Sequence, residues 1–253
     1  MRRWIWAAFV LGLLLSGVQV NSAETYIDEF ARANALYEQK DYTSAIQAYS
    51  RIVNEGWESA SLYFNLGNAY FKEGDLGHAI LYYLRARRLD PSDEDVIHNL
   101  EFARRFSWVQ MEGVQLNPIK SFMVSLVDPY RIDMLAWATS ACFVLLFLFL
   151  IVRYGLGINN SGVRVGMVLS LVLLVVSFSL ATFKYRHDFL TRRGVIISEE
   201  VPVRTGPSER SDIELQGSPG LIVEILDETD DYLNVLFENK RRGWVKKDLV
   251  AEI

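Results

Sequence analysis

Residues 134–152 read MLAWATSACFVLLFLFLIV, and residues 163–183 read VRVGMVLSLVLLVVSFSLATF. Each run has about the 20 residues that an α-helix needs to cross the hydrocarbon core of a bilayer. The first run carries no charged residue, and the second carries only Arg164, next to its start. The polar loop between the runs is too short to bring the chain back across a membrane. The two runs therefore predict a transmembrane helical hairpin whose flanking segments lie on one side of the bilayer.

The first residues of the chain have the pattern of a secretory signal. Residues 1–23 begin with Arg2 and Arg3, continue with an apolar stretch and end in small and polar residues. The alternative is an uncleaved anchor helix. Both interpretations export the segment after residue 23, so we expect a multi-pass protein of the bacterial inner membrane with both soluble modules in the periplasm. Lys184 and Arg186, after the second run, oppose this orientation, although such residues could contact anionic headgroups of the outer leaflet.

Charge and cysteine content limit the function classes. The chain has 253 residues and a formal net charge of −5, and the segments before and after the hairpin are both acidic. Proteins that bind nucleic acid carry a basic patch or stripe, so we expect no nucleic-acid partner. Cys142 is the single cysteine and lies inside the first apolar run, which excludes an intrachain disulfide.

A period of 34 residues runs through residues 24–112. The stretch ANALY at residues 33–37 aligns with GNAYF at residues 67–71, and DYTSAI at 41–46 aligns with DLGHAI at 75–80. A fixed period of this length is typical of stacked helix–turn–helix units. The segment is therefore predicted to be an all-α repeat module.

This segment resembles the tetratricopeptide repeat. Residues 60–93 carry the pattern best, with Leu66-Gly67 and Pro91 in their expected places, and residues 26–59 carry it more weakly. Residues 93–106 are predicted to form the solvating cap helix that a stacked array needs at its end. The resemblance implies a scaffold that binds peptides along a groove lined by the first helix of each pair.

Four asparagines recur at the groove-facing positions of this pattern. They are Asn34, Asn65, Asn68 and Asn99. Amide side chains can pair with both the N–H and C=O groups of an extended peptide, so we predict that they form a peptide-binding site. The alternative is that they are solvated surface residues or brace neighbouring repeats. Phe30 and Asp95 stand where the carboxylate-binding members of the family have basic residues, which disfavours recognition of a peptide C-terminus.

Residues 113–133 connect the repeats to the hairpin. After a linker, apolar residues from Ile119 to Val127 recur at a spacing that forms one helix face. This pattern predicts either an interfacial helix on the membrane surface or a helix packed on the repeats. Asp128-Pro129 is predicted to provide the N-cap and the first-turn proline of the first spanning helix.

The last segment, residues 194–253, has the period of β-strands. Strands are predicted at residues 195–197, 221–226 and 232–237, separated by clusters of turn residues. About five short strands in a segment of this size favour a small all-β barrel. VPVRTGPS at residues 201–208 and RGWV at residues 242–245 resemble the opening and closing motifs of bacterial Src-homology-3 (SH3) domains.

Some barrels of this kind bind cell-wall peptides, and others only mediate protein contacts. Tyr232 and Trp244 are the aromatic candidates for a ligand face on the barrel. The alternative is that Trp244 belongs to the core and that Gly243 makes room beside it. The ligand could therefore be peptidoglycan or another protein.

The sequence shows no catalytic signature. The three histidines, His78, His98 and His187, have no metal-ligand spacing, and phosphate-binding glycine loops and nucleophile motifs are absent. We therefore predict a non-enzymatic protein without a catalytic residue, metal site or cofactor.

The domain order resembles the BatE-type proteins of the aerotolerance (Bat) operon, in which repeats precede two spans and an SH3-like domain. The resemblance implies a membrane-anchored scaffold that assembles or stabilises an envelope complex with membrane proteins that carry von Willebrand A domains. The alternative function is a cell-wall sensor or anchor that binds peptidoglycan through the SH3-like domain.

Overall fold

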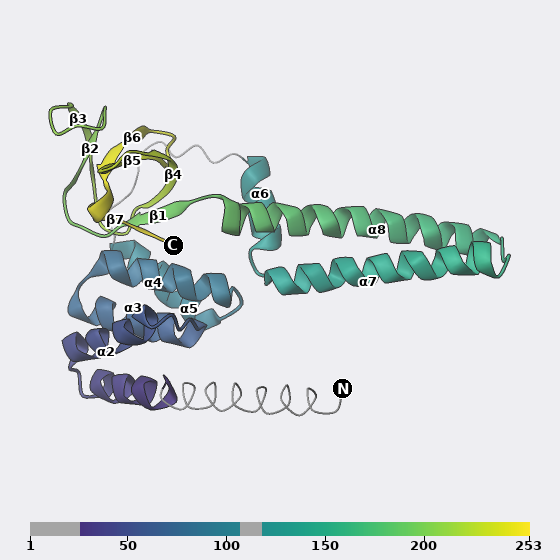
Figure 1. Cartoon of the computed structure of the whole chain (residues 1–253), viewed down its shortest axis with the longest axis horizontal. Helices are drawn as coiled ribbons and strands as arrows, with labels where there is room; N and C mark the ends of the chain where they lie inside the picture. The colour runs from purple at the N-terminus through teal and green to yellow at the C-terminus, as the bar shows by residue number, and fades with distance from the viewer. Residues whose placement is uncertain (1–25, 107–117) are drawn as a thin grey trace, which may run out of the picture.

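The computed structural model describes residues 26–106 and 118–253. A stack of helices, a long helical hairpin and a β-sheet module succeed one another along the chain, and the hairpin projects away from the other two parts (Figure 1). The signal predicted at residues 1–23 and most of the linker before residue 118 lie outside the described residues.

The first module consists of helices that pack on their sequence neighbours. Residues 26–38 are helical, and the next helices are α2 (Tyr42–Asn54), α3 (Ala60–Glu73), α4 (Leu76–Leu89) and α5 (Glu94–Phe106). The two loops inside the pairs are built alike. The Asp41 side chain accepts the backbone N–H of Ser44 at 3.1 Å, and Asp75 accepts that of His78 at 3.0 Å. These N-caps fix where α2 and α4 begin.

Small residues let the helices of a pair approach closely. Ala33, Ala45 and Ala79 are fully buried. A Cβ atom added to Gly67 on α3 would come within 2.8 Å of the Tyr83 ring on α4. The predicted helix–turn–helix units and the predicted helix over 93–106 are therefore present, and α5 covers α4 at the end of the stack.

The hairpin consists of α7 (Ile132–Leu150), which continues in a π-helical turn to Gly155, and α8 (Ser161–Tyr185), which continues in another to Leu190. Among the described residues, these two helices are long and apolar enough to cross a membrane, with mean hydropathies of 2.5 and 2.4. Asn160 caps α8 by accepting the Val163 N–H at 2.8 Å. The hairpin predicted from the two apolar runs is present as a pair of packed helices.

The predicted start of the first long helix at Asp128-Pro129 is wrong. Helix α7 begins at Ile132, and Arg131 occupies its N-cap position. Asp128 instead forms an ion pair with Arg87 on α4. The Asp128 carboxylate, which the local sequence predicts as a helix N-cap, therefore pairs with Arg87 on a distant helix instead.

Helix α6 (Pro118–Val127) lies crosswise to α8 near the C-terminal end of that helix (Figure 1). Val127 is buried, whereas Phe122 is 65% exposed. The apolar stripe is thus divided between a packed edge and an open edge. The open edge is what an interfacial helix requires.

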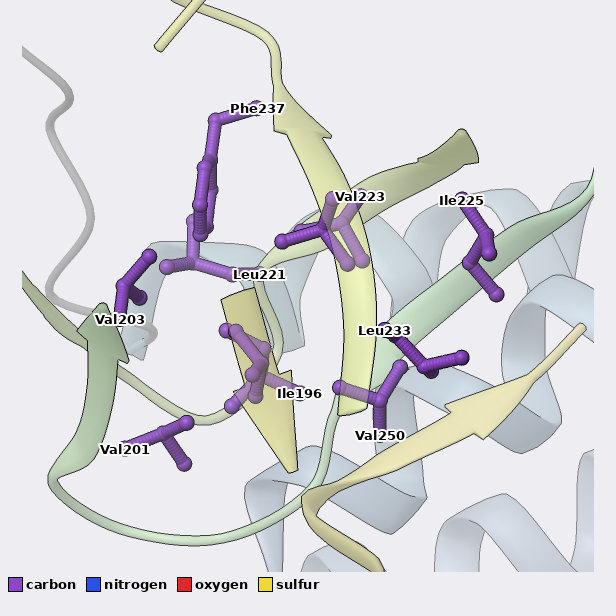
Figure 2. Packing of buried hydrophobic residues seen from close by; sticks show 11 residues of the cluster. Ile196, Val201, Val203, Leu221, Val223, Ile225, Leu233, Phe237 and Val250 are labelled. Carbon is purple, nitrogen blue, oxygen red and sulfur yellow. The ribbon is translucent and has the colours of Figure 1, made fainter. Parts of the chain in front are cut away.

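Within residues 193–253, seven strands form one antiparallel sheet in the order β3-β2-β6-β5-β4-β1-β7. The strands are β1 (Arg193–Ile196), β2 (Val201–Arg204), β3 (Ile213–Gly217), β4 (Ile222–Glu228), β5 (Tyr232–Phe237), β6 (Arg242–Lys246) and β7 (Val250–Glu252). The sheet curls around apolar side chains such as Ile196, Val203 and Phe237, which face one another in the core (Figure 2). The strands predicted around 195–197, 221–226 and 232–237 correspond to β1, β4 and β5.

The β-sheet module packs on helix α4. The fully buried Val195 of β1 belongs to the same apolar cluster as Ala79 and Ile80. A Cβ atom on Gly77 would come within 2.6 Å of the Ile197 Cα, so only glycine allows this approach. The repeats and the β-sheet module therefore touch directly, although the hairpin separates them in the sequence.

Polar contacts close the edge of the same interface. Arg85 and Arg88 on α4 donate to the backbone oxygens of Glu252 and Ile253 at 2.5 and 3.0 Å. Arg104 on α5 forms an ion pair with Glu238 at 3.6 Å. Two successive repeat helices thus hold the β-sheet module.

Candidate functional site

The four predicted groove asparagines come from the first helices of successive units. Asn34 lies in the helix over 26–38, Asn65 and Asn68 lie in α3, and Asn99 lies in α5. The structure brings them together in two pairs, Asn34 with Asn65 and Asn68 with Asn99. All four side chains are partly exposed.

Each pair forms a cluster with a tyrosine from a second helix. The Asn34 Oδ1 atom accepts the Tyr49 hydroxyl at 2.6 Å and the Asn65 Nδ2 group at 2.9 Å. The second cluster repeats the first 34 residues later. There the Asn68 Oδ1 atom accepts the Tyr83 hydroxyl at 2.7 Å and the Asn99 Nδ2 group at 2.9 Å.

The two tyrosines act as fixed donors. Both rings are almost fully buried, and burial raises the pKa of Tyr49 to about 12. Burial also raises the pKa of Tyr83. A hydroxyl that stays neutral at ordinary pH keeps its proton to donate. The tyrosines therefore hold the Oδ1 atoms of Asn34 and Asn68 inward.

The fixed orientation determines what each pair can offer to a ligand. With Oδ1 engaged, the Nδ2 donor of Asn34 is left over, and with Nδ2 engaged, the Oδ1 acceptor of Asn65 is left over. In the described part of the chain, neither group has a further hydrogen bond. The same holds for Asn68 and Asn99. The asparagines brace adjacent repeats, and each pair still presents one donor and one acceptor.

An aromatic group lies beside the second cluster and was not predicted from the sequence. Phe71, Phe102 and Phe106 form three ring contacts, with centroids 5.0–5.9 Å apart. Phe102 and Phe106 are 43% and 53% exposed. Phe102 and Phe106 come after Asn99 at i+3 and i+7, which is one face of α5. That spacing is the sequence signal that could have found the group.

The helical module can now be assigned. A family model described as tetratricopeptide repeat matches residues 30–94. Residues 30–94 are tetratricopeptide repeats. This match confirms the interpretation of the 34-residue period, and such repeats are protein-binding scaffolds.

The comparisons with solved structures and with curated proteins do not extend this assignment. Among solved structures, the chain is similar to the TPR2AB-domain:pHSP90 complex of yeast Sti1 at 19% sequence identity and a TM-score of 0.29. The match covers 64% of this chain and 64% of that chain, so it spans less than two thirds of the solved protein. No curated protein matches this chain.

The repeats lack cations at the two positions noted in the sequence. The Phe30 ring stacks on Tyr26 with centroids 5.9 Å apart and packs against Tyr49. Asp95 is exposed in the first turn of α5. Neither residue carries a positive charge that could pair with a peptide carboxylate.

The two aromatic candidates of the β-sheet module lie on its outer face. Trp244 of β6 is opposite Asn234 of β5, and Tyr232 is opposite Lys246. Trp244 is partly exposed and outside the core cluster, which excludes the core alternative. Gly243 does make room, because a Cβ atom there would strike Val203.

Tyr232 is only 6% exposed, and its buried hydroxyl has no hydrogen-bond partner among the described residues. Within residues 26–106 and 118–253, no three side chains of His, Cys, Asp or Glu are placed to hold a metal ion together.

Proposed function

We propose that this protein is a non-enzymatic, membrane-anchored scaffold that binds an extended segment of a partner protein on the asparagine face of its repeats. Tetratricopeptide repeats supply the protein-binding role. The asparagine face is defined as Asn34, Asn65, Asn68 and Asn99 together with the Phe71–Phe102–Phe106 group. Proteins with such repeats are typically binding scaffolds without catalysis.

The duplicated Tyr–Asn–Asn cluster is the observation that supports this proposal. An extended peptide presents alternating N–H and C=O groups, and each asparagine pair offers one acceptor and one donor. Because buried tyrosines hold the amides, little side-chain entropy is lost when a peptide binds. The exposed phenylalanines beside Asn99 provide an apolar anchor of the kind that contributes most binding energy at interfaces.

The membrane placement is supported by the hairpin and by the contact between the soluble modules. Two modules that touch must lie on the same side of a bilayer, and a pair of spans keeps both flanks on one side. Arg85 and Arg88 on α4 contact the end of the β-sheet module. We therefore propose that both modules lie in the periplasm and serve a Bat-like envelope complex with von Willebrand A domain proteins.

The test variant keeps the hydrogen bonds that the asparagine Oδ1 atoms accept and removes only the outward Nδ2 donors. In N34D/N68D, a carboxylate oxygen still accepts from the tyrosine and from the partner asparagine, but the outward NH₂ groups are lost. The matched control is N54D, which adds the same kind of charge at an exposed position at the end of α2. Partner capture from gently solubilised membranes should fall for N34D/N68D and not for N54D. Equal capture by both variants would rule out the asparagine face.

A second function rests on the outer face of the β-sheet module. The partly exposed Trp244 favours a small ligand that contacts its ring, such as a cell-wall peptide. Cosedimentation of the solubilised full-length protein with purified peptidoglycan, compared between wild type and W244A, tests this alternative. Binding that W244A abolishes would support the cell-wall role.

A further inference from the structure

A cavity of about 730 Å³ lies where all parts of the molecule meet. Its walls come from the end of α4, from α5, α6, the end of α8, and strands β1, β4 and β5. Six basic side chains line it, namely Arg87, Arg88, Arg104, Lys184, Arg193 and Lys240. Four carboxylates line it as well, namely Asp128, Asp188, Glu224 and Glu238. The Lys, Arg, Asp and Glu side chains that line the cavity therefore sum to a formal charge of +2.

The carboxylates are already shared among the cations. Asp188 contacts Lys184 at 2.9 Å, His187 at 2.8 Å and Arg193 at 4.0 Å. Arg87 forms an ion pair with Asp128, and Arg104 forms an ion pair with Glu238. One carboxylate thus serves three groups at the membrane-proximal wall, and the positive charge there is only partly compensated.

Two cations form no ion pair with an Asp or Glu side chain within the described residues. Arg88 donates to the backbone oxygen of Ile253 at 3.0 Å, and Lys240 lies in the turn that leads into β6. Because no Asp or Glu side chain compensates these two charges, both can contact an additional anion in the cavity.

Partial burial and mutual repulsion make the positive charge of the arginines in this cavity unfavourable. Side chains of Arg87 and Arg193 are only 31% and 29% exposed. Burial, followed by the neighbouring Arg104 and Arg193, lowers the pKa of Arg87, and burial also lowers the pKa of Arg193. Half-buried cations that repel one another are stabilised by an anion that accepts several hydrogen bonds.

We propose that this cavity binds the phosphate headgroup of an anionic phospholipid. Arginine side chains match phosphate oxygens in a bidentate manner, and the volume is within the range of about 300–1,000 Å³ for small-ligand sites. Apolar side chains on the same walls, Leu84, Val124 and Ile222, suit the glycerol and the first acyl carbons. The inference rests on the proposed membrane anchoring, because only then does a lipid surface reach the end of α8.

The position of α6 makes a lipid the favoured source of the phosphate. Helix α6 lies crosswise to α8 (Figure 1). Its residues Val124 and Ser125 line the cavity, and its residues Phe122 and Leu126 are exposed. Such a helix can insert its open apolar edge among acyl chains. A headgroup bound between α4, α6 and β4 would then fix the repeats and the β-sheet module on the membrane surface.

The test measures lipid binding by the full-length protein in detergent micelles. The probes are phosphatidylglycerol, phosphatidylcholine and inorganic phosphate, and the readout is native mass spectrometry of bound molecules. The variant R88Q/K240Q removes two cations without leaving an Asp or Glu side chain unpaired. R51Q/K72Q is the matched control, because it removes one arginine and one lysine at exposed sites of α2 and α3.

We expect phosphatidylglycerol to bind in preference to phosphatidylcholine, and R88Q/K240Q to weaken that binding by about tenfold or more, with R51Q/K72Q like wild type. Equal binding of both lipids, unchanged binding by R88Q/K240Q, or saturation by inorganic phosphate that prevents lipid binding would overturn the proposal. Flotation with liposomes separates the two proposals. A protein that does not float refutes the membrane anchoring, and one that floats without preference for phosphatidylglycerol refutes only the headgroup site.

Discussion

The duplicated tyrosine–asparagine cluster makes a quantitative prediction about the stability of the repeats. In Y83F, the Asn68 Oδ1 atom loses the hydroxyl at 2.7 Å but still accepts from Asn99 at 2.9 Å. No buried group is left unpaired, so we expect a loss of about 1 kcal/mol. In N68A, the buried Tyr83 hydroxyl and the Asn99 amide both lose their acceptor, so we expect a loss of about 2 kcal/mol or more.

Native-state hydrogen exchange of α3 and α4 amides, read by mass spectrometry, measures this local stability without requiring that the whole chain unfold at once. Exchange should accelerate about fivefold in Y83F and about thirtyfold in N68A. Y82F is the matched control, because the Tyr82 hydroxyl has no hydrogen bond within the described residues. A Y83F effect as large as that of N68A, or no effect in N68A, would refute the reasoning.

Two further predictions concern the module contact and the pH dependence of the repeats. G77A places a methyl group against the Ile197 backbone, so the free energy of unfolding should fall by about 1–3 kcal/mol in thermal melts of the solubilised protein, whereas G162A should melt like wild type. Burial raises the pKa of Tyr49 from 10.0 to about 12, so its contribution is complete below pH 10 and is lost as pH rises toward 12. Far-UV circular dichroism should detect this alkaline loss in wild type and a smaller loss in Y49F, and identical profiles would contradict it.

The sequence predicts the repeats and the hairpin well because both depend on local patterns. The 34-residue spacing of small and aromatic residues reflects contacts inside one unit, and uninterrupted apolar runs reflect helix length alone. Strands β1, β4 and β5 were also predicted, because each is a short run rich in β-branched, aliphatic or aromatic residues between clusters of turn residues. Strands β3 and β7 were not among the predicted strands. Ile213 in β3 is exposed, and β7 has only three residues.

Contacts between segments that are distant in the chain could not be predicted from the sequence. The 34-residue spacing relates Tyr49 to Tyr83 as it relates Asn34 to Asn68. It does not show that each tyrosine donates to an asparagine, because the two residues of a pair lie on different helices. Asp128 has a good local position for a helix cap, yet Arg87 takes its carboxylate. Residues from several helices and strands line the basic cavity, so no single stretch of sequence predicts it.

The packing of α4 against the β-sheet module is another contact that could not be predicted from the sequence. Gly77 appears in the sequence as a small residue inside a helix, and only the structure shows Ile197 against it. Glycine is less favourable than alanine in a helix, by up to about 1 kcal/mol in the interior, and Gly77 is the second residue of α4. The close approach of β1 explains why glycine is nevertheless used there.

The central claim is that a helical hairpin holds the repeats and the β-sheet module together on the outer side of the membrane. Single cysteines at Lys72, Asn159 and Glu199, introduced with C142S, report on the repeats, the hairpin loop and the β-sheet module. The measurement is labelling by a membrane-impermeant maleimide in bacterial spheroplasts and in lysed cells. The account predicts labelling at positions 72 and 199 in spheroplasts and at 159 only after lysis. Protection of position 72 or 199 until lysis would contradict it.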